Sequence, residues 1–163
     1  MNTMTRLMLI ASLALTFAAC KKEETTQQVE QAPVSAPTSE DRGAWVAYIS
    51  DVVNRNMEGI SNQPFVYLLP GESTPDFQDQ YDRLAEKITA DVSRGIVKGN
   101  LLAYASPASA KMADTVVEAF KGVEANTMKG VRVLFIGKAE DGERVKTAVA
   151  PAGVEYVFVD TAK

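Results

Sequence analysis

Four short, almost continuously apolar runs lie along the chain, and each follows a longer stretch with helical periodicity. The runs occupy residues 64–70, 100–106, 130–137 and 154–159. An apolar run of about 4–8 residues that is bounded by turn residues is typical of a strand buried on both faces of a sheet. The sequence therefore predicts four buried strands.

The stretches between these runs repeat their apolar residues with a period near 3.6. In the first, Trp45, Ile49 and Val53 are spaced four residues apart, which puts them on one face of a helix. Asp41 is its expected N-cap and Gly59 its expected stop. The second is expected to start at Thr74-Pro75-Asp76, a capping residue followed by a proline and an acid. The predicted helices cover residues 44–59, 75–94, 107–123 and 140–150.

Helices and strands alternate in the order α-β-α-β-α-β-α-β, which predicts an α/β fold with a mostly parallel sheet. We expect a small three-layer sandwich, with right-handed connections between the strands. The predicted strand order is 2-1-3-4, as in half of a flavodoxin-like or Rossmann-like domain. A two-layer arrangement is the alternative.

The first 20 residues have the pattern of a secretory signal. Arg6 gives positive charge, residues 7–17 form an apolar core, and Ala18-Ala19-Cys20 follow. The core is shorter than the roughly 20 apolar residues that a membrane-spanning helix needs. Cleavage before Cys20 puts the bulky Phe17 at position −3, where ordinary signal peptidase prefers a small residue. An ordinary signal peptide cut after Ala18 is the alternative.

The Phe17-Ala18-Ala19-Cys20 segment resembles the lipobox of bacterial lipoproteins, although Phe17 stands where that family usually has leucine. Cys20 is the only cysteine of the chain. The resemblance implies that residues 1–19 are removed and that Cys20 carries a diacylglycerol, so that the membrane is a partner through the lipid. Lys21, rather than an aspartate, follows the cysteine. In this family, that implies the outer membrane and a domain that faces the periplasm.

Residues 20–42 are rich in Gln, Thr, Glu, Ala, Ser and Pro and lack aromatic residues. Such a segment buries too little apolar surface to offset the entropy of ordering it, so we expect a disordered tether. The composition becomes that of a globular domain at about Gly43. Residues 43–163 are long enough for one domain with its own core.

Several classes of function are disfavoured by what the chain lacks. The net charge is −4 and there is no basic cluster, so no nucleic-acid partner is expected. The absence of histidine excludes a Ser-His-Asp triad and histidine metal sites. Glycine-rich phosphate-binding motifs are also missing. Asp141 and Glu143 are interpreted as acids at a helix start rather than as metal ligands. We expect neither a cofactor nor a metal.

In an open α/β sheet, ligands bind beyond the carboxyl ends of the strands, at the point where the strand order reverses. With the order 2-1-3-4, this crevice would lie between the first and third strands. Hydroxyls, backbone amides at a helix start and a lysine there would suit an anion. As an alternative, the same residues are ordinary turn and capping residues. The candidate residues are Gly71, Glu72, Ser73, Thr74, Ser106, Gly137, Lys138 and Asp160.

The chain is therefore expected to be a lipid-anchored periplasmic domain that binds an envelope protein or a small ligand. The alternative is a small hydrolase or transferase that works without histidine, using Ser106, Lys138 or Asp160. A third interpretation is a spacer with no ligand of its own. Convergence of these side chains in a closed pocket would favour the enzyme.

Overall fold

The computed structural model describes residues 32–162, which form one compact unit. The predictions for the signal peptide, for Cys20 and for the first part of the tether lie outside these residues. The described unit confirms the predicted α/β fold, with a helix first and a four-stranded sheet whose strands are all parallel. The elements are α1 (Arg42–Arg55), β1 (Phe65–Leu68), α2 (Phe77–Ser93), β2 (Leu101–Ala105), α3 (Ser109–Phe120), β3 (Arg132–Gly137), α4 (Ala139–Val149), a 3-10 turn (Ala150–Ala152) and β4 (Glu155–Asp160).

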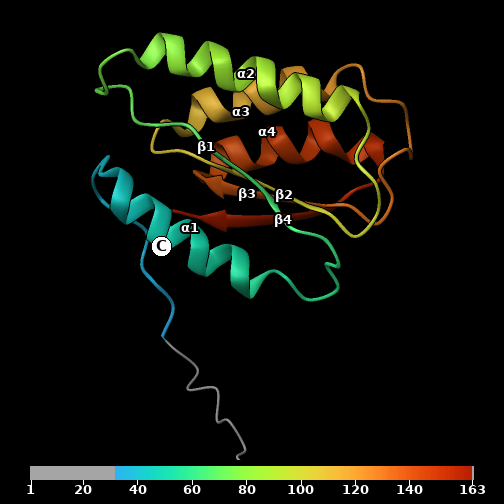
Figure 1. Cartoon of the computed structure of the whole chain (residues 1–163), viewed down its shortest axis with the longest axis horizontal. Helices are drawn as coiled ribbons and strands as arrows, with labels where there is room; N and C mark the ends of the chain where they lie inside the picture. The colour runs from blue at the N-terminus through green and yellow to red at the C-terminus, as the bar shows by residue number, and fades with distance from the viewer. Residues whose placement is uncertain (1–31, 163) are drawn as a thin grey trace, which may run out of the picture. The chain divides into compact units, whose positions relative to one another are not determined.

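The strands lie in the order β1-β2-β3-β4, so the predicted order 2-1-3-4 was wrong. Each connection moves one strand along in the same direction, and right-handed connections then place all their helices on one face. Accordingly, α2, α3 and α4 cover one face and α1 lies alone on the other (Figure 1). The three layers were predicted correctly. The order never reverses, however, so the expected crevice between the first and third strands does not exist.

The sheet separates two apolar cores, and successive residues of the central strands alternate between them. Leu102, Tyr104, Val133 and Phe135 belong to the core under α2, α3 and α4. The neighbouring positions of the same two strands, Leu101, Ala103, Leu134 and Ile136, belong to the core under α1. Every one of these eight side chains is inaccessible to solvent. The prediction of strands buried on both faces is therefore right for β2 and β3.

The edge strands are less buried than predicted. In β1, Phe65 is 37% exposed and Val66 is 47% exposed. Val66 is paired with Ala103 and thus lies on the α1 side of the sheet, where a single helix cannot cover four strands. An apolar run does not distinguish a central strand from an edge strand, because that depends on which strands become neighbours.

Helix starts agree only partly with the predicted caps. Asp41 is the N-cap of α1, and its Oδ1 accepts a hydrogen bond of 2.8 Å from the Ala44 N–H. The start of α2 is different: the helix begins at Phe77, after Asp76 in a left-handed conformation with φ of 58°, and no side chain caps it. Thr74 therefore precedes a turn rather than the helix, and its carbonyl accepts from the Phe77 N–H.

Arg132, at the start of β3, connects the end of α1 to the sheet. Its Nη1 donates to the carbonyl oxygens of Asn56, at 2.6 Å, and Glu58, at 2.9 Å. Its Nη2 forms an ion pair with Glu155 of β4 at 2.9 Å. The cation thus satisfies carbonyl groups that a helix end leaves without partners in its own backbone. Arg132 thereby ties the C-terminal end of α1 to the amino ends of β3 and β4.

Candidate functional site

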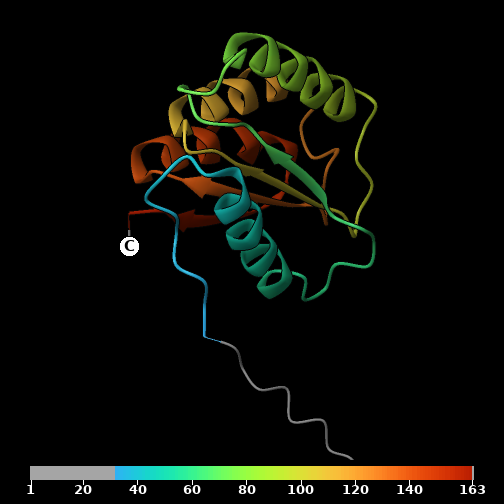
Figure 2. The same ribbon diagram turned by 60° about the vertical axis from the view of Figure 1, so that its left-hand side comes forward.

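The carboxyl edge of the sheet is covered by the chain itself. Residues 32–41, here called the strap, run past α1 to the edge where the strands end, and the chain then turns back into α1 (Figures 1 and 2). The Val34 N–H donates to Asp51 Oδ2 of α1 at 3.1 Å. Trp45 Nε1 donates to the Ser39 carbonyl at 2.8 Å, and Ala36 packs on the core under α1. The second half of the segment expected to be a tether is therefore part of the domain.

Glu40, at the end of the strap, lies against the loop between β1 and α2. Its Oε2 accepts hydrogen bonds from both the backbone N–H of Ser73, at 3.2 Å, and the Ser73 hydroxyl. Gly71 permits this approach: a Cβ there would lie 2.0 Å from Glu40 Cδ. Of the predicted crevice residues, Ser73 therefore binds a carboxylate, and that carboxylate belongs to the same chain.

A hollow of about 190 Å³ lies beside Glu40. Thr74 lines it, whereas Glu72 points from the same loop into solvent and is exposed. Apolar walls come from Trp45, Leu68 and two prolines, and polar groups come from the strap and α2. The lining residues are Glu40, Arg42, Trp45, Leu68, Pro70, Thr74, Gln80 and Pro107.

Ser106 and Lys138 line a second hollow, of about 270 Å³, on the other side of Glu40 and Trp45. Their polar groups serve the local backbone. The buried Ser106 Oγ accepts from the Ala108 N–H at 2.8 Å. The backbone N–H of Lys138 donates to Ser109 Oγ at 2.9 Å, and the Lys138 side chain is exposed. Gly137, the last residue of β3, lies next to Ser109, and a Cβ on it would be 2.5 Å from Ser109 Oγ. Ser106 and Lys138 therefore share a surface without bonding to each other.

Asp160 lies apart from these residues. Its Oδ1 accepts from the Ala162 N–H at 2.9 Å, and it lines a third hollow, of about 340 Å³, between the strap, α1 and β4. Tyr48 lines the same hollow. Burial, followed by the negative charges of Asp160 and Asp51, raises the pKa of the Tyr48 phenol above its ordinary value. Asp160 thus adds to the effect of burial on this phenol and lines a different hollow from Ser106 and Lys138.

The arrangement offers little for covalent catalysis. A nucleophilic hydroxyl needs a base within hydrogen-bond reach, but Ser106 and Ser109 both accept from backbone amides. Asp141 is buried near the N-terminus of α4 and lies 3.8 Å from Arg144 Nε, as expected for an acid at a helix start. Within residues 32–162, no three acidic residues lie close enough together to hold a metal ion.

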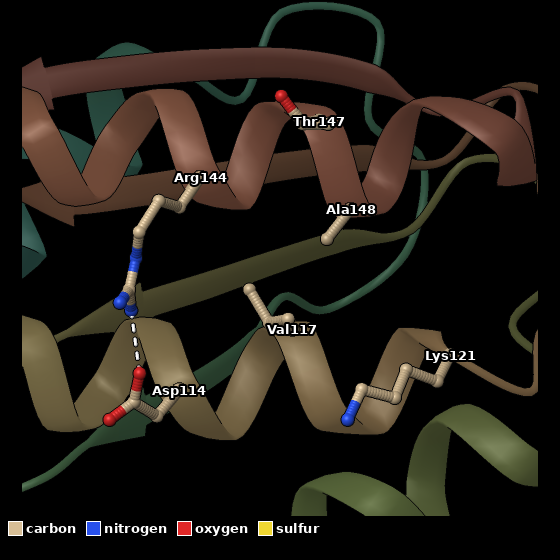
Figure 3. Close-up of a pocket in the computed structure, with 6 residues that line it drawn as sticks. All are labelled: Asp114, Val117, Lys121, Arg144, Thr147 and Ala148. Carbon is tan, nitrogen blue, oxygen red and sulfur yellow. Dashed lines mark hydrogen bonds and ion pairs between the residues drawn. The ribbon is translucent and has the colours of Figure 1, made fainter.

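A separate groove of about 540 Å³ opens between α3 and α4, on the helical layer (Figure 3). Val117 and Ala148, both half-buried, form an apolar floor. Asp114 of α3 and Arg144 of α4 bridge its rim with an ion pair of 2.6 Å. Lys121 and Thr147 complete the lining. Nothing in the sequence indicates this groove, because it depends on how two helices pack beside each other.

A buried polar network under α2 was also missed. Asp91 is only 6% exposed, and its carboxylate accepts from Tyr67 Oη at 2.8 Å, from Lys87 Nζ at 2.7 Å and from Arg94. These bonds, led by the one from Lys87, hold the pKa of Asp91 below its ordinary value against the opposing effect of burial. Tyr67 stacks on Tyr104 with ring centroids 5.1 Å apart. The burial of Asp91 could have been predicted from the sequence, because Asp91 falls on the apolar stripe of its helix, three residues after the buried Ile88.

Comparison of the chain with family models, with curated proteins and with solved structures gave no match. None of the helices within residues 32–162 is long and apolar enough to cross a membrane.

Proposed function

We propose that this chain is a lipid-anchored domain of the bacterial cell envelope that faces the periplasm and binds a protein partner through the groove between α3 and α4. The observation that carries the binding role is the groove itself, which has an apolar floor and a charged rim (Figure 3). Binding sites for protein side chains combine apolar contact area with a few polar groups that fix orientation. A partner would bury Val117 and Ala148 while facing Asp114 and Arg144.

The anchor is supported by residues 1–20 and by the position of Cys20 as the single cysteine. A lipoprotein of this kind is held by two or three acyl chains, whereas a single chain binds a membrane only marginally. In this proposal, residues 21–31 are the tether that precedes the compact unit beginning at Ala32. Their reach is at most about 40 Å. The domain would therefore search close to the membrane surface, which is proposed to be that of the outer membrane.

The Cys20→Ser variant tests the anchor. We expect it to lose labelling by radioactive palmitate and to move from the membrane fraction to the soluble fraction, because the serine hydroxyl does not become the lipid thioether. The measurement is labelling and fractionation of cells that produce either full chain. Retention of the variant in the membrane fraction without label would overturn the lipid anchor.

The alternative function, a hydrolase or transferase acting at the carboxyl ends of the strands, has less support. Its groups would be Ser106, Lys138 and Asp160. Asp160 lines a different hollow from the other two, and the Ser106 hydroxyl is engaged with the backbone. The edge is also covered by the strap. These contacts favour a role for the three residues in connecting strands to helices.

A photo-crosslinking residue at Thr147 tests the groove. Thr147 is exposed at the groove, so we expect light to join the full chain in intact cells to one partner of defined mass. Gln78, exposed on α2, is the matched control position and should give no such product. The Ala148→Glu change, which places a charge on the apolar floor, should reduce the Thr147 product about tenfold. Equal products at both positions, or a product indifferent to Ala148→Glu, would contradict partner binding in the groove.

A further inference from the structure

We propose that the loop of residues 71–74 is a carboxylate-binding site, and that Glu40 occupies it from within the chain as a displaceable substitute for an external ligand. The ligand class is a small carboxylate with an apolar group of a few carbon atoms. The strap would leave the edge of the sheet when such a ligand binds. This site is separate from the groove between α3 and α4 and does not depend on the lipid anchor.

The loop holds the carboxylate of Glu40 in the way that proteins hold a bound anion. One carboxylate oxygen accepts from both the N–H and the hydroxyl of Ser73. Hydrogen bonds to a charged acceptor are the stronger kind, and a backbone N–H together with a hydroxyl forms a recurring site for an anion. Gly71 leaves the space that the carboxyl group fills, since a Cβ there would be 2.1 Å from the same oxygen. The loop thus shows its ligand chemistry directly, with a carboxylate in place.

The space beside the Glu40 carboxylate is large enough for the apolar part of a small ligand. The hollow of about 190 Å³ next to Glu40 has walls from Trp45, Leu68 and Pro107, and Arg42 lies at its rim. A ligand whose carboxylate replaced that of Glu40 could place its apolar part against these walls. Ligand sites typically combine apolar walls with a few polar groups that fix orientation. The hollow therefore selects a carboxylate joined to an apolar group.

The strap is held by few enough contacts to be displaced. Glu40 and Ser73 are both exposed, and the Val34–Asp51 bond at the other end is exposed as well. Between them, the bond from Trp45 to the Ser39 carbonyl is partly buried. Segments with few buried apolar contacts and exposed hydrogen bonds are the first to open locally. A ligand that competes for Ser73 would remove one of these attachments and favour the open strap.

Trp45 makes the opening measurable. It is the single tryptophan of the chain, it is 4% exposed, and it bonds to the strap. In the full chain, Glu40→Ala should raise the acrylamide quenching constant of its fluorescence about threefold, because the strap opens locally. Millimolar butyrate should then protect Trp45 again although the strap stays open, because its apolar part would lie against the Trp45 wall of the hollow. Butyramide, which has the same shape without the charge, should not.

Matched variants separate the site from general loosening. Gly71→Ala should open the strap like Glu40→Ala, because the added Cβ would occupy the place of the carboxyl group, whereas Gly122→Ala has free space and should change nothing. Glu72→Ala removes the same charge from an exposed neighbour and should also change nothing. Adding Ser73→Ala to Glu40→Ala should abolish the response to butyrate. Far-UV circular dichroism checks that each variant is folded, and Glu40→Gln provides a milder second test.

Three outcomes would overturn the proposal. Unchanged quenching in Glu40→Ala and Gly71→Ala would mean that Glu40 does not hold the strap. Failure of butyrate to reduce the quenching of Trp45 in Glu40→Ala would mean that the loop is not a carboxylate site. Protection by butyramide, or by butyrate without Ser73, would mean that the ligand acts elsewhere. Membrane fractionation and crosslinking from Thr147 test the proposed function separately, so the two can fail independently.

Discussion

The Trp45→Ala variant should unfold with a free energy about 3–5 kcal/mol lower than that of the parent chain, the range for loss of a large aromatic side chain from a core. Trp45 is 4% exposed and belongs to the core between α1 and the sheet. Its ring packs edge-to-face against Tyr48, with centroids 6.1 Å apart. Since α1 alone covers that face among the described elements, no second helix can move in to close the cavity.

The measurement is urea unfolding followed by far-UV circular dichroism, which does not require the tryptophan. Val46→Ala is the matched control: Val46 is the next residue of α1 but is 48% exposed. Its stability should stay within about 0.5 kcal/mol of the parent value. Loss of the Trp45–Ser39 bond should also speed hydrogen exchange in the strap. Equal effects of the two substitutions would contradict the placement of α1 on the sheet.

The second large effect is expected at Asp91, where alanine should cost about 2–3 kcal/mol of unfolding free energy. The substitution leaves the hydroxyl of the buried Tyr67 without its acceptor and removes the ion pairs to Lys87 and Arg94. The measurement is urea unfolding at neutral pH. Tyr67→Phe keeps the aromatic stack and removes only the hydroxyl. The double variant should therefore lose less than the sum of the two single variants.

The pH dependence gives a second test of Asp91. Its pKa in the folded chain is lowered, first by the hydrogen bond from Lys87. A lowered pKa stabilises the fold at pH values above the unfolded-state pKa of about 3.9, and this contribution is lost as the pH falls through the folded-state value. The stability difference between the parent and Asp91→Ala should therefore shrink below about pH 4. Glu86→Ala, an exposed change on the same helix, should leave the stability at neutral pH within about 0.5 kcal/mol of the parent value. A difference that persists in acid would contradict the network.

The contacts that hold the strap could not be predicted from its composition. Residues 21–31 and residues 32–41 each contain one valine and no aromatic residue, so both segments were predicted to be a tether. Residues 32–41 are nevertheless held by Asp51, Trp45 and Ser73, which lie 6 to 33 positions further along the chain. Local composition describes what a segment can bury by itself. It carries no information on partners supplied by a distant loop and a helix face.

The candidate site shows the same limit. The β1–α2 loop was singled out from its glycine and hydroxyl residues, and in the structure its Ser73 donates to the carboxylate of Glu40. The partner was missed because Glu40 precedes the first helix and was assigned to the tether. Asp160 was grouped with Ser106 and Lys138 because all three lie where strands end at the same edge of the sheet, which does not tell which face a side chain takes. In the structure, β4 is an edge strand and carries Asp160 to a hollow beside α1.

The sequence by itself determined the alternation of helices and strands, the parallel sheet and the deep burial of β2 and β3. These features follow from the apolar period along the chain, which is a local property. Tertiary structure alone decided the strand order, the uneven cover of the two sheet faces, the groove between α3 and α4, and the position of the strap. Strands buried on both faces have the same pattern whichever neighbours they take. The choice among neighbours is therefore made by connection lengths and packing, which involve residues far apart in the chain.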